Sequence, residues 1–291
     1  MPYTSPSVAT ITDAVLNVDF GFEAQTVGRM RGRIDEDLDM MRGFPLYGDN
    51  HIVYPRNELV ERIEQQDINK AWNSFYIVEG HDQNGDVSCV YNMLAAIIEG
   101  SWNRSFGIEN YLTLSPMSGY RWNGTRNSGS NIFGSANWGE GTGLLPLRSE
   151  RNLSLAQRGL FKHTHPHNGY GTTFQNGWKE TAKSFRLQEW YRIRSVEEWY
   201  SAAINGFGLG GGRSGHAIYH CLLSIDNGNL YSGYLNSWGQ WGATLEIARG
   251  QMLKSFGWDS ESRIRSMINH GAYAGRTIRR PSWLPMQGLA A

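Results

Sequence analysis

The apolar residues of this chain gather in a few short periodic stretches that longer polar stretches separate. The clearest stretch has helical spacing and consists of Val90, Met93, Leu94, Ile97 and Ile98. Residues at these intervals form one continuous stripe along a helix. Ser88 precedes the stripe as a candidate N-cap, and Gly100 follows it as a stop signal. The pattern therefore predicts a buried helix that begins near residue 89 and ends at residue 100.

A second helix is predicted over residues 55–67. Its candidate N-cap is Asn57, and its apolar positions at helical spacing are Leu59, Val60 and Ile63. The segment before it shows few strand signals. We therefore interpret residues 1–75 as an extension that packs on the main domain or contacts a partner.

The second half of the chain is richer in strand signals. A short helix is predicted over 195–206, with acidic residues in its first turn and a glycine at its end. Two β-rich runs, 216–226 and 229–238, flank an Asn-Gly turn signal. Residues 243–249 alternate between apolar and polar and predict a further strand. A helical first part followed by a β-rich second part indicates the α+β class.

Composition and charge narrow the function classes. The 291 residues include 27 basic and 27 acidic ones, so we expect no basic surface for nucleic acid. The longest apolar run, 93–98, is far shorter than the ~20 residues of a membrane span, and the N-terminus lacks a secretory signal pattern. Two cysteines provide no disulfide framework. We expect a protein that binds neither nucleic acid nor membrane, and that stays inside the cell or is assembled into a particle.

Cys89 lies at the start of the predicted buried helix. A helix N-terminus stabilises a thiolate, which is the form of cysteine that attacks a carbonyl carbon. Catalysis further requires a histidine for proton exchange, a group that orients it and a donor for the oxyanion. A cysteine at a helix start is by itself more often a small buried apolar residue. Its role therefore depends on the motifs elsewhere in the chain.

Three stretches in order resemble motifs of the papain-like cysteine peptidase family. DQNGDVSCV, which contains Cys89, is similar to the family's D-Q-G-x-C-G-S-C-W. His216 lies in GHA, as in the family's G-H-A-V, and Asn236 begins NSWGQWG, as in N-S-W-G-x-x-W-G. Gln83 lies six residues before the cysteine, which is the spacing of the family's oxyanion glutamine. Weaker sequence similarities lie between these motifs, so that the resemblance covers about residues 75–250.

The resemblance implies a two-lobed fold, with a helical left lobe, a β-rich right lobe and a cleft between them. It implies that Cys89 is the nucleophile and that His216 exchanges protons with it. Asn236 would orient the imidazole. The Gln83 side-chain amide and the backbone N–H of the cysteine would hold the oxyanion.

Two supporting residues and the domain limits also follow from the resemblance. Ser88 precedes the nucleophile as a serine does in the family, and Trp238 would shield the His–Asn hydrogen bond from water. The implied arrangement is an N-terminal extension (1–75), a peptidase domain (76–255) and a C-terminal extension (256–291). No cofactor and no metal are implied.

Several departures from the family pattern bear on activity. Asp86 replaces a cysteine that forms a disulfide in the family, so a carboxylate lies near the nucleophile. Val90 replaces the tryptophan after the nucleophile, and the NSWGQWG motif is one residue short, which affects the packing of Trp241. The glycine-rich run 207–212 replaces a longer strand and loop before His216. We interpret this run as a flexible flap or as a loose support for the histidine.

Two functions of different classes remain. The first is a thiol hydrolase whose partner is a peptide or protein substrate and which cleaves peptide or isopeptide bonds. The second is a structural component, such as a bacteriophage virion protein, that retains the fold with little or no activity. Such a component would assemble through residues 1–75 and 256–291. Because all four site residues are retained, the hydrolase is favoured.

A histidine cluster is a further candidate site. His163, His165 and His167 alternate and would share one face of a strand, where they could hold a transition metal. Pro166 interrupts such a strand, and no carboxylate or cysteine completes the set nearby. We therefore expect a surface loop.

Other residues have simpler interpretations. His220 would share a strand face with the family histidine and could compete for its role, but the GHA match favours His216. Cys221 lies in an apolar run and is expected to be a buried, inert thiol. We interpret most of the eleven tryptophans as core or loop anchors rather than as a surface for sugar stacking.

Overall fold

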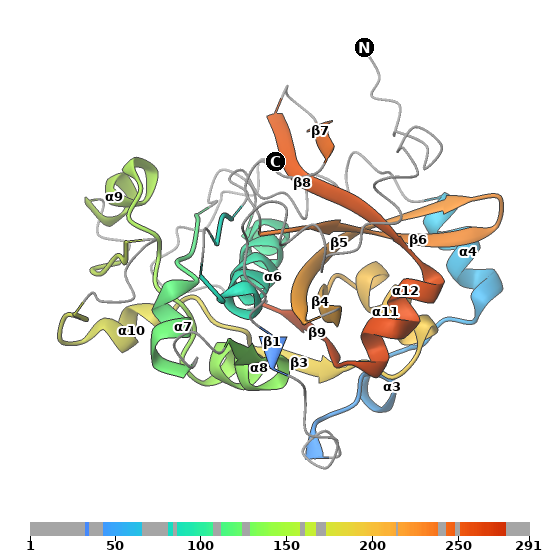
Figure 1. Cartoon of the computed structure of the whole chain (residues 1–291), viewed down its shortest axis with the longest axis horizontal. Helices are drawn as coiled ribbons and strands as arrows, with labels where there is room; N and C mark the ends of the chain where they lie inside the picture. The colour runs from blue at the N-terminus through green and yellow to red at the C-terminus, as the bar shows by residue number, and fades with distance from the viewer. Residues whose placement is uncertain are drawn as a thin grey trace, which may run out of the picture.

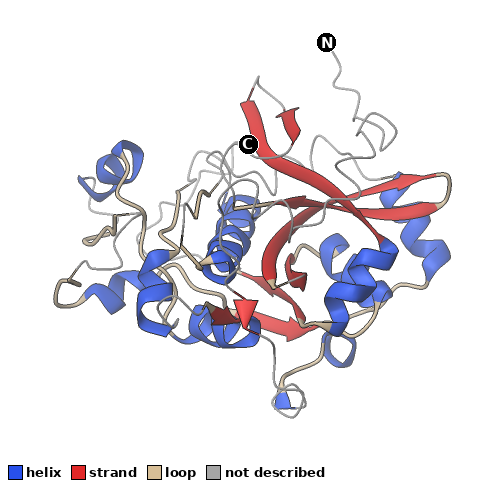
Figure 2. Cartoon of the chain, viewed as in Figure 1, coloured by secondary structure: helices blue, strands red, loops and turns tan. Residues whose placement is uncertain are grey.

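The computed structural model describes eleven segments of the chain, residues 33–34, 43–65, 81–83, 86–106, 112–123, 129–157, 161–166, 173–213, 215–237, 243–247 and 251–277. Helices in these segments lie on both sides of a curved sheet (Figures 1 and 2). One long helix, α6, lies beside the sheet in the middle of the view. The described helices are α3 (Tyr47–Asn50), α4 (Arg56–Glu64), α6 (Cys89–Phe106), α7 (Met117–Asn123), α8 (Ile132–Gly141), α9 (Glu150–Gln157), α10 (Trp178–Ala182), α11 (Val196–Ile204) and α12 (Glu261–Asn269). None of them is long and apolar enough to cross a bilayer.

The described strands are β1 (Arg33–Ile34), β2 (Ser130–Asn131), β3 (Glu189–Arg192), β4 (Gly208–Arg213), β5 (His216–Asp226), β6 (Asn229–Leu235), β7 (Ala243–Ile247), β8 (Gln251–Ser260) and β9 (Ala272–Arg276). Within the described segments, seven of them form one antiparallel sheet in the order β3-β9-β4-β5-β6-β8-β7. One face of this sheet packs against α6 and α8, and the other packs against α4, α11 and α12. In Figure 1, α7, α9 and α10 lie to the left of α6, and most of the sheet lies to its right. The fold thus combines helices with an antiparallel sheet, as expected for the mixed α+β class.

The last described segment of the chain, 251–277, contributes two strands to the sheet. The expected limit of the peptidase domain, at residue 255, falls inside β8, and β9 is hydrogen-bonded between β3 and β4. Within the expected C-terminal extension, the end of β8 and strand β9 are therefore part of the sheet, and α12 packs on one face of it. Strand β9, with the sequence AYAGR, is short, and three of its five residues are alanine or glycine, so it carries little strand signal in the sequence.

The described parts of residues 1–75 pack on the rest of the fold. Leu59 and Ile63 of α4 are buried in the cluster that contains α11 and α12. The helix begins at Arg56 with Pro55 as its N-cap, so the expected cap at Asn57 is wrong. A proline lacks the N–H that a helix start leaves without an intrahelical partner, and its fixed φ suits the turn.

Strand β1 adds to a separate parallel pair. Arg33 lies opposite Ser130 and Ile34 opposite Asn131, immediately before α8. Asn131 caps α8 by accepting a hydrogen bond from the backbone N–H of Gly134 at 2.6 Å. The earliest described segment of the chain therefore lies against the start of α8.

Helix α6 begins at Cys89, as the pattern predicts, but it continues through Gly100 to Phe106. Every residue from 89 to 103 is buried, including Trp102. Burial on all sides compensates for the ~1 kcal/mol by which glycine weakens a helix, so the glycine does not end it.

The glycine-rich run before His216 is strand β4, and the interpretation as a flexible flap is wrong. All six residues of β4 are buried, and the strand is hydrogen-bonded to β5 on one side and β9 on the other. A Cβ placed on Gly210 would lie 2.7 Å from Sδ of Met93 and 2.9 Å from Cδ1 of Ile97. The glycines therefore allow α6 to lie directly on the sheet.

The remaining predicted elements are confirmed. Helix α11 is capped by Ser195, whose hydroxyl accepts the backbone N–H of Glu198. Strands β5 and β6 form a hairpin around Asn227 and Gly228, both at positive φ, and β7 follows. Positive φ at both turn positions is the requirement that makes Asn-Gly a hairpin signal.

We expect Gly210→Ala to lower the free energy of unfolding by about 1–3 kcal/mol, because its methyl group would overpack the contact with α6. Urea unfolding monitored by tryptophan fluorescence would measure the change. The matched control is Gly141→Ala at the end of α8, where a Cβ would meet nothing within 4 Å. That variant should stay within about 0.5 kcal/mol of the parent. Equal midpoints for all three proteins would contradict the packing of β4 on α6.

Candidate active site

Cys89 is the first residue of α6 and is completely buried. The carbonyl of Ser88 accepts the backbone N–H groups of Tyr91 and Asn92, both at 3.0 Å. The Ser88 hydroxyl accepts the side-chain amide of Asn92, also at 3.0 Å. These bonds fix the first turn of the helix, and with it the position of the thiol.

His216 and Asn236 are paired. Nε2 of the imidazole lies 2.7 Å from Oδ1 of Asn236, and the backbone N–H of Ser237 donates to the same oxygen at 2.8 Å. Since a backbone N–H is always a donor, the shared atom is an oxygen, and the imidazole must also donate to it. The neutral imidazole therefore carries its proton on Nε2, and Nδ1 is its basic nitrogen.

Ser237 joins this pair to the loop before α6. Its hydroxyl donates to Oε1 of Gln83 at 2.7 Å, and its carbonyl accepts the backbone N–H of Gln83 at 2.8 Å. The amide nitrogen of Gln83 in turn donates to the carbonyl of Asp86 at 2.7 Å. Gln83 and Asn236, which are 153 positions apart in the sequence, thus both hydrogen-bond to Ser237.

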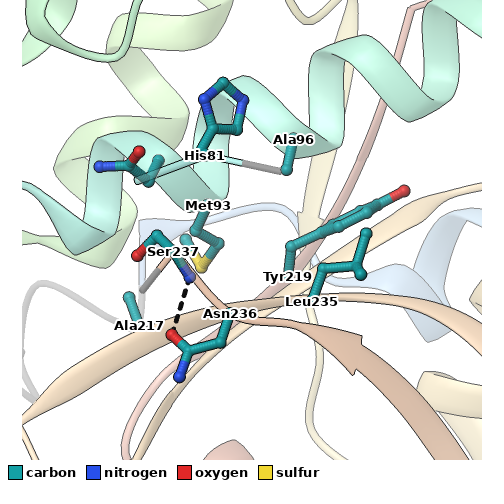
Figure 3. Close-up of a pocket in the computed structure, with 9 residues that line it drawn as sticks. His81, Met93, Ala96, Ala217, Tyr219, Leu235, Asn236 and Ser237 are labelled. Atoms are coloured by element: carbon teal, nitrogen blue, oxygen red, sulfur yellow. Dashed lines mark hydrogen bonds between the residues drawn. The ribbon is translucent and has the colours of Figure 1, made fainter. Parts of the chain in front are cut away.

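A small cavity lies where α6 faces β5 and the end of β6 (Figure 3). Its volume is about 20 Å³, which is enough for about one water molecule. It is lined by His81, Asn92, Met93, Ala96, Ala217, Tyr219, Leu235, Asn236 and Ser237. Cys89 lies one turn before Asn92 on the same side of the helix, and His216 directly precedes Ala217. Helix α6 and strand β5 therefore face each other across this cavity, near the ends that carry Cys89 and His216.

Asp86 and Val90, two departures from the family pattern, are among the described residues, whereas the two tryptophans of NSWGQWG are not. Trp238 and Trp241 lie outside the described residues. Val90 is fully buried in the core around α6. Asp86 is partly exposed, and its backbone N–H donates to the carbonyl of Gln83 at 2.9 Å.

His220 belongs to a different buried cluster. Its Nδ1 lies 3.1 Å from Oγ of Ser232, its Nε2 lies 3.6 Å from Oδ2 of Asp259, and Trp199 of α11 packs edge-on against its ring. Arg213 is paired with Asp259. Burial, reinforced by the positive charge of Arg213, holds the pKa of His220 well below its usual range. Burial also raises the pKa of Asp259, although Arg213 opposes that shift.

Cys221 is buried, and burial raises the pKa of its thiol well above the usual range. The prediction of a buried thiol is confirmed, and a raised pKa disfavours the thiolate that would react.

The described members of the histidine cluster do not form a surface loop. His165 is buried, with Nδ1 at 3.0 Å from Oγ of Ser115, and burial lowers its pKa to about 4. Nδ1 of His163 lies 2.9 Å from Oε1 of Gln175, and His167 lies outside the described residues. Across the described segments, no group of three or more His, Cys, Asp or Glu side chains could hold a metal ion.

The sequence patterns did not predict one feature beside the site. Nε2 of His81 lies 3.1 and 3.0 Å from the two carboxylate oxygens of Glu99, and both residues are buried. The backbone N–H of Leu114 also donates to Glu99, at 2.6 Å. The available signal was an acidic residue directly after the apolar run of a buried helix, because a charge in that place needs a partner.

No family model matches the sequence, and no curated protein matches it. Solved structures do match it. Xylellain, a cysteine protease from Xylella fastidiosa, is 15% identical with a TM-score of 0.52, and the alignment covers 85% of this chain and 96% of that one. Procathepsin B S9 from Trypanosoma congolense is 15% identical with a TM-score of 0.51 and 89% coverage of both chains. Procathepsin L2 from the Tenebrio molitor midgut is 12% identical with a TM-score of 0.55, covering 90% and 84%. This chain therefore has the papain-like cysteine protease fold.

We expect His220→Gln to change the pH dependence of stability. The folded chain holds His220 neutral, whereas the unfolded chain takes up a proton near pH 6.5. The unfolded state thus binds more protons below that pH, so His220 makes the free energy of unfolding fall as the pH drops, by at most ~1.4 kcal/mol per pH unit. Glutamine does not titrate and should remove this slope.

Urea unfolding at pH 5, 6 and 7 would measure the slope in both chains. Asp259 remains in place in the variant, so the difference between the chains reports the imidazole. His163→Gln is the control for loss of a histidine in a partly exposed position. An unchanged slope in His220→Gln would contradict the buried, neutral state of this residue.

Proposed function

We propose that this protein is a thiol hydrolase that cleaves peptide or isopeptide bonds with Cys89, His216 and Asn236. The observation that supports this most is the 2.7 Å hydrogen bond from Nε2 of His216 to Asn236. It orients the imidazole and assigns the basic nitrogen to Nδ1, at the end of β5 that α6 faces. The N-terminus of the 18-residue α6 adds a partial positive charge beside the thiol.

In the proposed reaction, Nδ1 of His216 takes the proton of the Cys89 thiol, and the sulfur attacks the carbonyl carbon of the substrate. The carbonyl electrons move to oxygen. The Gln83 amide and the backbone N–H of Cys89 donate hydrogen bonds to the oxyanion that forms. When the C–N bond breaks, the imidazolium gives its proton to the departing amine. A water molecule, deprotonated by the same imidazole, then attacks the thioester, releases the carboxylic acid and restores the thiol.

A structural role is the second candidate, and one observation favours it. The side chains of Cys89 and His216 are both 0% exposed, so the thiol has no contact with solvent in this conformation. A virion or other assembly component that keeps the fold would not require such contact. Its partner surfaces would come from residues 1–75 and from the part of 256–291 outside the sheet. In either role we propose a location inside the cell or within a particle made there, with no binding of nucleic acid or membrane.

Alkylation by iodoacetamide between pH 5 and 7, with each cysteine followed by mass spectrometry, distinguishes the two functions. For a hydrolase we expect rapid labelling of Cys89 that persists to pH 5, because a thiolate–imidazolium pair keeps the sulfur ionised. Cys221 should label slowly throughout and serves as the internal reference. His216→Ala should abolish the labelling of Cys89 at pH 5, and urea unfolding would verify that this variant is folded. Equal, slow labelling of both cysteines would contradict the hydrolase and favour the structural role.

A further inference from the structure

The segment 81–83 is attached at both ends to different parts of the fold. Nε2 of His81 lies 3.1 and 3.0 Å from the carboxylate oxygens of Glu99, in the third turn of α6. Two residues later, Gln83 is bound to Ser237 through both its backbone N–H and its side-chain oxygen. His81 and Ser237 also line the same cavity, in which Figure 3 shows His81 beside α6.

The pairing of His81 with Glu99 is a strong constraint because both groups are buried. The side chains are 5% and 0% exposed, and a carboxylate withdrawn from water needs a cation or several hydrogen-bond donors. Tyr219, across the cavity on β5, adds no second charge. Its pKa is raised well above the usual range by burial, then by Cys221 and Glu99. Loss of the imidazole would leave the carboxylate poorly compensated, and segment 81–83 would have to shift to admit water.

We propose that His81 is a positioning residue for the oxyanion site, a role that rests on the proposed thiol hydrolase function. By holding one end of the segment 81–83 against α6, it keeps the Gln83 amide at a constant distance from Cys89, ten residues before Glu99 on the same helix. Ser237 holds the other end of the segment. The nucleophile and the oxyanion donor are thereby both held in place by α6, as efficient stabilisation of an oxyanion requires.

Two reagents separate this role from the formation of the nucleophile. Iodoacetamide alkylates sulfur by displacing iodide, and no oxyanion forms. p-Nitrophenyl acetate acylates sulfur through a tetrahedral oxyanion, whose collapse breaks the C–O bond, releases p-nitrophenolate and leaves acetyl-cysteine. The ratio of the two rates at Cys89, with Cys89→Ser as the blank, therefore reports the oxyanion site.

For His81→Gln we expect the acylation rate to fall about tenfold or more, since complete loss of an oxyanion donor costs about 10²–10³ in rate. The alkylation rate should change less than about threefold. His81→Lys places an ammonium donor opposite Glu99 and should recover most of the acylation rate. Adding Glu99→Gln to His81→Gln removes the buried negative charge that the imidazole had faced and should recover part of the acylation rate. His163→Gln, the matched substitution at a histidine remote from these residues in the sequence, should leave both rates unchanged.

Every outcome is decisive. An equal fall in both rates for His81→Gln would mean a general loss of the site and would overturn the positioning role, as would no fall in either. Failure of both His81→Lys and the double variant to recover acylation would also overturn it. If the parent chain itself shows no rapid labelling of Cys89 at pH 5, the proposed hydrolase function fails, and the role of His81 fails with it. Normal labelling of the parent with an unchanged ratio in the variant would overturn the role of His81 alone.

Discussion

The burial of α6 on all its sides is the constraint on which the rest of the structure depends. A helix covered by helices on one side and by the sheet on the other cannot rotate or shift without disturbing its packing on both sides. Close approach to the sheet is possible because β4 offers glycines where the helix crosses it. The same burial makes an unpartnered polar side chain on α6 costly, and Asn92 is paired with Ser88 and Glu99 with His81. Cys89, the first residue of this helix, therefore has a well-defined position relative to the sheet and to the helices that surround α6.

The junction between the helix and the strands is held by few atoms. Ser237 uses its N–H, carbonyl and hydroxyl at once, one toward Asn236 and two toward Gln83. A bond network with this connectivity transmits a displacement of the loop directly to the imidazole partner. The candidate site therefore lies at the interface between α6 and the strands, and neither side of this interface contains all of its residues.

The sequence predicted the elements whose patterns are local. The apolar stripe of α6, the cap of α11 and the Asn-Gly hairpin each depend on residues close together in the chain, and each is present. Motif spacing also indicated Cys89, His216, Asn236 and Gln83, and the structure brings the last three together through Ser237. What the sequence did not predict depends on distant partners. β4 is a strand because its glycines fit under α6, and β9 is one because β3 and β4 flank it.

Buried polar groups alone do not identify a functional site in this protein, because the described residues contain several such clusters, one of them around Arg213. Arg213, Asp259 and His220 are as deeply buried as the group around Asn236, and replacing such ion pairs with apolar residues is often neutral or stabilising. The difference lies in position. The Arg213 cluster is built from β4, β5, β6, β8 and α11, where His220 contacts a serine, an aspartate and a tryptophan. The Asn236 group instead links the start of β5, the end of β6 and the loop before α6, and Asn236 and Ser237 line the same cavity as α6. Placement at a junction between packed units makes the Asn236 group suited to chemistry, whereas the Arg213 cluster is suited to holding one lobe together.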